Sequence, residues 1–244
     1  YKAGWNLAEE FVNMFIGHGG EFFKAGTAEP NINNAKGVAT LNMLKKLASL
    51  SNPDYLTHDS EAIKVEWESG KVALMTLWAS RSGTLLDDEG DAKITAATKL
   101  TGPATVGGGN IPAATLWWDG FTLAKNRSDS DAEATFIALA HAASNKKMVA
   151  DAADQAVWLV EGFVPGPKSI GVIEAVKMGA KPYPMLPQMG LMHGALGSEI
   201  VEFLQGKESA EQALKDVEAA YISKAKEQGC LLYTSDAADE TGRV

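Results

Sequence analysis

Apolar residues recur every three or four positions in several stretches of this chain, which is the spacing of an amphipathic helix. Val38, Leu41, Leu44 and Leu47 follow this spacing closely. Each such stretch ends near glycine, proline or a cluster of polar residues. The pattern predicts helices over residues 35–50, 60–68, 146–154, 169–178, 193–204 and 209–226.

Capping residues mark the starts of two helices. Ser128-Asp-Ser-Asp131 precedes a segment that carries Phe136 and Ile137 on one face, so a helix is predicted there too. Ser209-Ala-Glu-Gln212 has the pattern of a capping box, in which the side chain at each end accepts a hydrogen bond from a backbone N–H group that the helix leaves unpaired.

Shorter apolar runs predict β-strands. Residues 71–77 follow the Ser69-Gly70 break and are mostly apolar, which favours a buried strand, and residues 93–99 and 120–125 favour two more. Residues 102–114 are rich in glycine and proline, which is typical of a loop or a crossover between lobes. Helices joined to short apolar strands predict an α/β fold.

The charge and composition exclude several classes of protein. Acidic residues outnumber basic ones, 31 to 22, and the net charge of −9 would repel a polyphosphate backbone, so no nucleic-acid partner is expected. Apolar runs such as residues 72–78 are far shorter than the roughly 20 residues of a membrane-spanning helix. The phosphate-loop, nucleophile-elbow and His-Glu-x-x-His motifs are absent, and the four histidines lack metal-ligand spacing. No cofactor and no metal are therefore expected.

Both ends of the sequence are unusual. The chain starts at Tyr1 and not at Met, so we expect that the natural N-terminus, with any signal region, lies upstream. Residues 230–240 change abruptly in composition and resemble a translated sequencing adapter. Residues 230–244, which include the only cysteine, Cys230, are therefore expected to be a non-native disordered tail and carry no functional inference.

Several local motifs occur in a fixed order along nearly all of residues 1–229, and together they resemble the family 1 extracellular solute-binding proteins of carbohydrate ABC transporters. The motifs are Gly19-Gly-Glu-Phe-Phe23, Pro30-Asn-Ile-Asn33, Trp67-Glu-Ser-Gly-Lys71, Trp118-Asp-Gly-Phe121, Gly162-Phe-Val-Pro165 and Gly206-Lys-Glu-Ser209.

The resemblance implies a two-lobed, type II periplasmic-binding-protein-like fold. By this analogy, residues 1–108 belong to the C-terminal lobe, 109–155 form a hinge crossover with a returning strand and helix of the N-terminal lobe, and 156–229 are further helices of the C-terminal lobe. It also implies a monomeric, periplasmic or extracellular receptor, with or without a lipid anchor, that serves ABC permease subunits.

Tryptophans beside polar residues are the candidate ligand contacts, because a sugar presents apolar C–H faces and a girdle of hydroxyls. Trp78 follows the predicted strand 71–77 and is expected at a cleft wall, and in the resembled family this segment supplies a stacking aromatic. Arg81, three residues later, is a hydrogen-bond candidate. The structural alternatives are a tryptophan that packs the lobe and a surface salt bridge.

Trp117, Trp118 and Asp119 form a second group of candidates. Asp119 resembles the aspartate with which glucose-type members of the family accept hydroxyl hydrogen bonds, or else it caps a turn before Gly120. The sequence does not decide which tryptophan faces the cleft.

His193 and Lys168 complete the expected ligand-binding set on the basis of the resemblance. A lone histidine is also typical of a helix end, and the second proline of Pro165-Gly-Pro167 departs from the family pattern near Lys168. Trp5 is a further candidate wall residue.

The predicted function is an extracellular, non-catalytic receptor for a sugar or sugar alcohol. One alternative is a receptor of the same fold for another solute, such as a polyamine. A remote alternative is a glycan-processing enzyme, which needs two carboxylates about 5 to 10 Å apart. With 31 acidic residues some pairing is inevitable, so this pattern alone does not favour catalysis.

Overall fold

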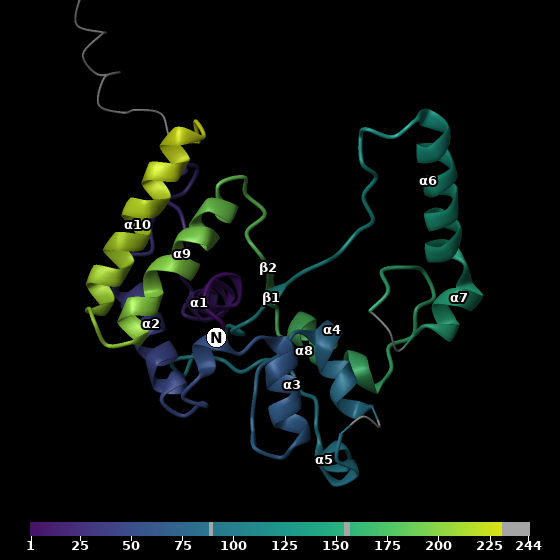
Figure 1. The fold of residues 1–244 in the computed structure, drawn as a ribbon, viewed down its shortest axis with the longest axis horizontal. Coiled ribbons are helices and arrows are strands. Elements are labelled where there is room, and N and C mark those ends of the chain that lie inside the picture. Colours follow the sequence, from purple (N-terminus) through teal and green to yellow (C-terminus); the bar gives the residue numbers. More distant parts are fainter. Residues whose placement is uncertain (88–89, 154–156, 231–244) are drawn as a thin grey trace, which may run out of the picture. The chain divides into compact units, whose positions relative to one another are not determined.

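Four helices from the two ends of the chain share one apolar core (Figure 1). They are α1 (Trp5–Gly17), α2 (Ala35–Ala48), α9 (Met189–Leu204) and α10 (Ala210–Glu227). Helix α9 packs against both α1 and α10, and α2 contacts all three. Phe11 and Phe15 of α1 stack on each other in this core. The core therefore depends on contacts between segments almost 200 residues apart.

Local capping chemistry accounts for where these helices begin. The Asn34 side chain accepts hydrogen bonds from the backbone N–H groups of Lys36 and Gly37, and the Ser209 hydroxyl accepts one from Gln212. The helices predicted over 35–50 and 209–226 are confirmed, and the helix predicted to begin at His193 begins earlier, at Met189.

The glycine-rich segment predicted as a loop is one. Thr105 and Pro112 form an isolated antiparallel bridge that closes it, and Gly107 takes a left-handed conformation with φ of 61°. Val106 approaches the end of α1 so closely that a Cβ on Gly17 would lie 2.9 Å from it. The loop thus places the segment that follows it, which contains Thr115, against α1.

The remaining helices lie between α2 and α9 in the sequence. They are α3 (Ser60–Glu68), α4 (Ala79–Ser82), α5 (Ala92–Ala97), α6 (Asp129–Ser144), α7 (Lys146–Asp151), α8 (Ile170–Lys177) and the 3-10 turns η1 (Tyr55–Thr57), η2 (Gly83–Leu86) and η3 (Pro167–Ser169). The predictions for residues 60–68 and for a helix capped by Ser128 are confirmed. The helices predicted over 146–154 and 169–178 are also present, with shorter bounds.

The three predicted strands are wrong. Residues 71–77 and 120–125 are not strands, and Leu74 of the first segment is 86% exposed. A strand requires a hydrogen-bonded neighbour, and neither segment has one among the described residues. Residues 93–99 overlap α5 instead, because the Asp91 side chain accepts from the Lys93 N–H and caps an alanine-rich helix.

The computed structural model describes residues 1–87, 90–153 and 157–230, so most of the predicted tail, residues 231–244, lies outside the described residues. Unit 1 contains Tyr1–Asp59, Ala104–Thr115 and the segment from Gly179, and unit 2 contains Ser60–Pro103 and Leu116–Met178. These contact-defined units are distinct from the predicted lobes, whose boundaries near 108 and 155 stay a prediction.

Regular β-structure in the described ranges is limited to one two-stranded sheet, β1 (Thr115–Leu116) with β2 (Lys181–Pro182). No helix in the same ranges is both long and apolar enough to cross a membrane.

Two phenylalanines in helices test which parts of the structure form the core and which lie at the surface. Phe11 is 0% exposed in the core of unit 1, whereas Phe136 on α6 is 64% exposed. We expect Phe11→Ala to lower the free energy of unfolding by about 3–5 kcal/mol through the cavity it leaves. Phe136→Ala in this chain should change it by less than about 0.5 kcal/mol. Urea unfolding followed by circular dichroism measures both, and equal losses would contradict the assigned core.

Candidate functional site

Trp78 and Trp117 contact each other in unit 2. Their ring centroids are 5.9 Å apart and their planes are inclined by 80°, an edge-to-face pair. Trp78 lies just before α4, and its carbonyl accepts hydrogen bonds from the N–H groups of Arg81 and Ser82. The two segments that contain the candidate tryptophans therefore meet, although the strand expected just before Trp78 is absent.

Trp118 and Asp119 extend this group toward solvent. Trp118 is 64% exposed and Trp117 is 37% exposed, and Asp119 is also exposed. Of the paired tryptophans, Trp117 is thus the one held by an aromatic neighbour, and Trp118 is the more accessible. An exposed indole next to a carboxylate offers both an apolar face and a hydrogen-bond acceptor.

The two predicted cationic contacts already have protein partners. Arg81 pairs with Glu61, and the Lys168 ammonium pairs with Asp87. Gly83 permits the second pair, because a Cβ there would lie 3.1 Å from the Lys168 Cβ. The Arg81 pair is largely exposed and contributes at most about 1 kcal/mol, so this guanidinium can exchange partners at low cost.

Unit 1 contains a polar row on α1, of which only Trp5 was a candidate from the sequence. Trp5, Glu9 and Asn13 are spaced four residues apart and share one face of α1. Glu9 is only 3% exposed, and the Thr115 hydroxyl donates to its Oε1 at 2.6 Å and lies 2.9 Å from Asn13 Oδ1. The glycine-rich loop brings Thr115 to this face.

His193 lies at the end of the same row and is 4% exposed. Its Nε2 donates to the Trp5 carbonyl oxygen at 2.9 Å, because a carbonyl can only accept. Its Nδ1 then accepts from the Tyr183 hydroxyl at 3.0 Å. Both ring nitrogens of His193 are thus engaged within the protein.

The electrostatics of this cluster follow from burial. Burial lowers the pKa of His193 below 6.5, and the hydrogen bond to Trp5 opposes this only in part. Burial raises the pKa of Tyr183, and the negative charge of Glu9 raises it further. At neutral pH the imidazole and the phenol are therefore both neutral.

Of these residues, the i, i+4 spacing of Trp5, Glu9 and Asn13 was visible in the sequence. Thr115 and Tyr183 had no local signal, because Thr115 reaches Glu9 of α1 from a distant segment and Tyr183 bonds His193 of α9. Among the candidate residues, His193 and Trp5 belong to unit 1, and the others belong to unit 2. In the described part of the chain, no three His, Cys, Asp or Glu side chains come together as a metal site.

The lowered pKa of His193 predicts a pH dependence of stability. As the pH falls through 6.5, the unfolded chain binds a proton at this histidine before the folded chain does, so the free energy of unfolding decreases. His193→Gln should reduce that decrease between about pH 7.5 and 5, while His141→Gln, at an exposed position on α6, should not. Two other groups leave a residual slope: His18, whose pKa burial also lowers, and Glu10, whose pKa burial raises to about 7 and which acts in the opposite direction. Identical pH profiles for the wild-type and His193→Gln proteins in urea unfolding would contradict the assignment.

No protein-family model and no curated protein sequence matches this chain. Solved structures do. A maltose/maltodextrin-binding domain from Bdellovibrio bacteriovorus, bound to maltotriose, superposes with a TM-score of 0.68 at 16% identity, covering 91% of this chain and 59% of that one.

Two ABC transporter solute-binding proteins give similar values. One from Agrobacterium radiobacter, in complex with ribitol, has a TM-score of 0.66 at 17% identity and covers 93% of this chain and 58% of its own. One from Agrobacterium vitis, with bound D-mannitol, has a TM-score of 0.64 at 16% identity, with 93% and 60% covered. The chain spans about three fifths of the length of these structures, and it has the periplasmic-binding-protein-like α/β fold that they share.

Proposed function

We propose that this chain is the larger part of a non-catalytic receptor that binds a neutral sugar or sugar alcohol outside the cytoplasm and delivers it to an ABC importer. The observation that carries the proposal is the aromatic group of unit 2, in which Trp78 and Trp117 contact each other and Trp118 and Asp119 are exposed beside them. The shared fold adds support, because solved proteins with this fold hold maltotriose, ribitol and D-mannitol.

The chemistry of these residues suits a polyol. An indole face packs against the C–H groups of a sugar, and a carboxylate accepts hydrogen bonds from adjacent hydroxyls. The carboxylate of Asp119 and the net charge of −9 both disfavour an anionic solute. A polyamine remains the alternative, since tryptophans beside a carboxylate also attract a cation.

Delivery would follow the mechanism of a hinged receptor. A solute that contacts both lobes binds their closed arrangement more tightly than the open one, and this difference in affinity selects the closed state. The permease would then recognise the closed state. No covalent step is needed, and the solved structures compared above are binding proteins, which supports a receptor over an enzyme.

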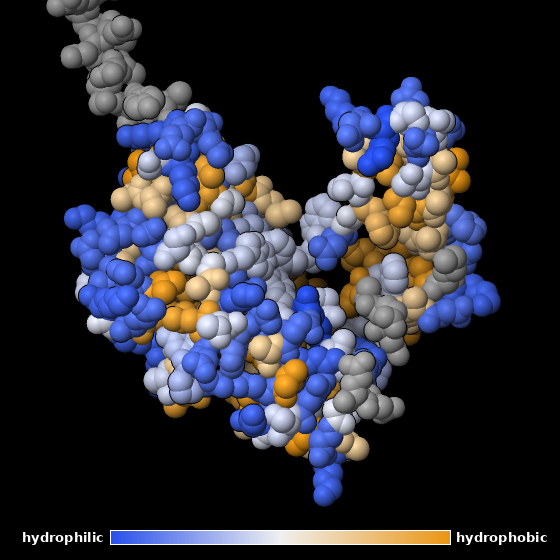
Figure 2. Space-filling model, in the orientation of Figure 1, coloured by the Kyte–Doolittle hydropathy of each residue, from blue (hydrophilic) through white to orange (hydrophobic). Residues whose placement is uncertain are grey.

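The lobe assignment is part of the proposal. Helix α6 exposes Phe136 and Ile137, and the segment before it exposes Phe121 and Leu123. In Figure 2, apolar residues gather around α6. Apolar side chains gathered on one helix face favour burial against another element. We propose that residues 109–155 return to an N-terminal lobe whose remaining residues, in the full-length protein, cover this face.

A thermal-shift series tests the proposed ligand class. The full-length protein should melt at a higher temperature with a mono-, di- or trisaccharide or a sugar alcohol, because a solute that binds only the folded state stabilises it, by about 2.7 kcal/mol at 100 times Kd. Putrescine and spermidine are the comparison solutes. If only the polyamines raise the melting temperature, the ligand is a cation and not a sugar. If no solute of the panel raises it, the sugar assignment is wrong.

Substitutions in the aromatic group test the site. Trp78→Ala and Asp119→Asn should each weaken binding of the stabilising sugar tenfold or more, equivalent to about 1.4 kcal/mol, because each removes a stacking surface or a charged acceptor. Glu133→Gln removes an exposed carboxylate on α6 and is the matched control. Isothermal titration calorimetry gives the affinities. Unchanged affinity in both site variants would show that the sugar binds at other residues.

A further inference from the structure

Asp119 and Gly120 form the only Asp-Gly step in the sequence, which has no Asn-Gly step. At such a step the amide nitrogen of the glycine can attack the carboxyl carbon of the preceding side chain. Glycine favours this attack, because it has no side chain to hinder the approach and its backbone turns easily. Whether the attack takes place in a folded protein depends on the structure around the two residues.

The surroundings of Asp119 and Gly120 in unit 2 leave both reacting groups accessible. The two residues are exposed and belong to neither a helix nor a strand. Among the described residues, the Asp119 carboxylate has no hydrogen-bond or ion-pair partner, and the Gly120 N–H group donates to no acceptor. The nitrogen and the carboxyl carbon can therefore approach each other without first breaking a contact.

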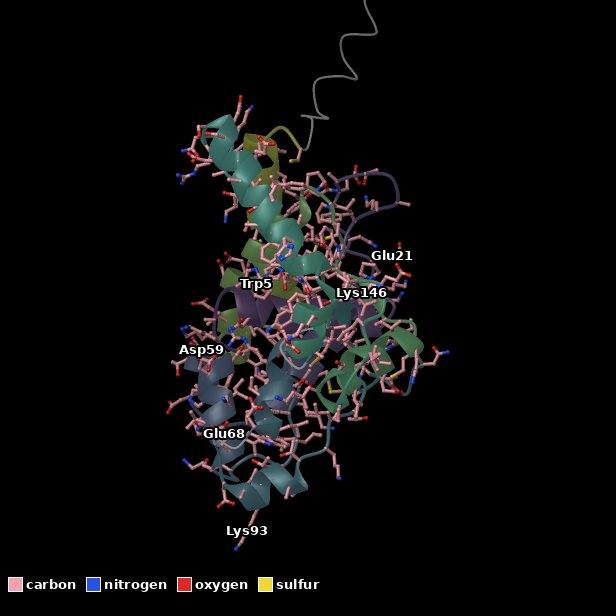
Figure 3. The ribbon with its side chains drawn as sticks, turned by 90° about the vertical axis from the view of Figure 1, so that its right-hand side faces the viewer. Trp5, Glu21, Asp59, Glu68, Lys93 and Lys146 are labelled. Atoms are coloured by element: carbon pink, nitrogen blue, oxygen red, sulfur yellow. The ribbon has the colours of Figure 1, made fainter. Side chains whose placement is uncertain are left out.

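Asp129 and Ser130 provide a comparison within the same unit. Serine is also a small residue and both positions are exposed, but they form the first turn of α6. Figure 3 shows α6 as the long helix that ends next to the labelled Lys146, the first residue of α7. A helical backbone has fixed dihedral angles, which do not bring an amide nitrogen onto the preceding carboxyl carbon. Local structure, more than exposure, thus distinguishes the two steps.

We propose that Asp119 is a site of spontaneous covalent modification, at which aspartate converts to isoaspartate, and that a bound solute slows this conversion. The effect of the solute rests on the proposed function, whereas the conversion itself depends only on the local structure. Isoaspartate lengthens the backbone by one methylene group and leaves the carboxylate attached directly to Cα. A carboxylate displaced in this way no longer accepts the hydrogen bonds proposed for Asp119, so the modified receptor should bind its solute more weakly.

The conversion has two steps and needs only solvent water. In the first, a bond forms between the Gly120 nitrogen and Cγ of Asp119, while the N–H hydrogen and the hydroxyl of the protonated carboxyl group leave as one water molecule. The product is a five-membered succinimide ring. In the second step, water adds to a ring carbonyl carbon and a C–N bond breaks. Breakage at Cγ restores aspartate, and breakage at the main-chain carbonyl carbon gives isoaspartate.

Peptide mapping of the full-length protein tests the modification. The protein is kept at neutral pH for several weeks, digested with a protease that cuts before aspartate but not before isoaspartate, and analysed by mass spectrometry. We expect cleavage before residue 119 to be lost progressively and cleavage before Asp129 to be retained. Asp119→Asn is the positive control, because it reaches the same ring by losing ammonia, a faster step than the loss of water.

Gly120→Ala is the matched variant that keeps the carboxylate. A Cβ at this position meets only a ring atom of Trp118, at 3.8 Å, so the variant should fold normally. Its methyl group hinders the attack, and the conversion should slow several-fold. The inference is wrong if isoaspartate is no more frequent at residue 119 than at residue 129, or if Gly120→Ala does not slow its formation.

Repeating the incubation with maltose, ribitol or D-mannitol separates this inference from the proposed function. A probe that raises the melting temperature should slow the conversion at Asp119 as its concentration saturates the protein, because hydroxyls bonded to the carboxylate keep it from the Gly120 nitrogen. If such a probe leaves the rate unchanged, the protective contact is wrong and the receptor function stands. If isoaspartate accumulates but no probe raises the melting temperature, the modification stands and the sugar receptor is wrong.

Discussion

The close packing of α1 on α9 is the contact on which the rest of unit 1 depends. Both helices bury an apolar face, and a Cβ on Gly197 of α9 would lie 2.4 Å from the carbonyl oxygen of Gly4, the residue just before α1. This contact fixes the start of α1 and so determines where its exposed and polar residues point. Burial of apolar side chains stabilises the contact between the two helices, while the two glycines allow their backbones to approach closely.

The same packing explains why a polar row can exist inside an apolar core. A buried carboxylate is costly unless hydrogen bonds compensate it. Glu9 accepts from Thr115, and His193 and Tyr183 satisfy each other and the Trp5 carbonyl. Each donor comes from a different segment, so the row forms only when the core of unit 1 is assembled. Polar groups with such partners keep the residues around them in one arrangement.

Unit 2 is organised differently. Its helices are mostly short, its ion pairs are partly or largely exposed, and many apolar side chains of α6 and of the extended segments are accessible. Exposed ion pairs contribute little to stability, and short helices depend on packing more than on propensity. Trp78 and Trp117, which contact each other edge to face, are the aromatic pair of this unit. In unit 1, Trp5 instead contacts a buried histidine, His193.

The helices were largely determined by the sequence itself, because their signals are local. Asn34, Ser128 and Ser209 cap their helices through atoms two or three residues away, and apolar spacing identifies the buried faces. Strands failed as predictions because a strand is defined by its neighbour, and the apolar run 71–77 says nothing about which segment would pair with it. Alanine and the cap at Asp91 outweighed the apolar run at 93–99.

For the candidate site, the sequence by itself singled out candidate residues, and only the tertiary structure shows what each of them contacts. Trp78, Trp117, Asp119 and His193 were candidates for sugar contacts, and the fold agrees with that of proteins solved with such ligands. His193 bonds partners 10 and 188 residues away, which no local pattern encodes. Short-range hydrogen bonds and periodicity specify elements, whereas burial, tautomer and accessibility are properties of the assembled core.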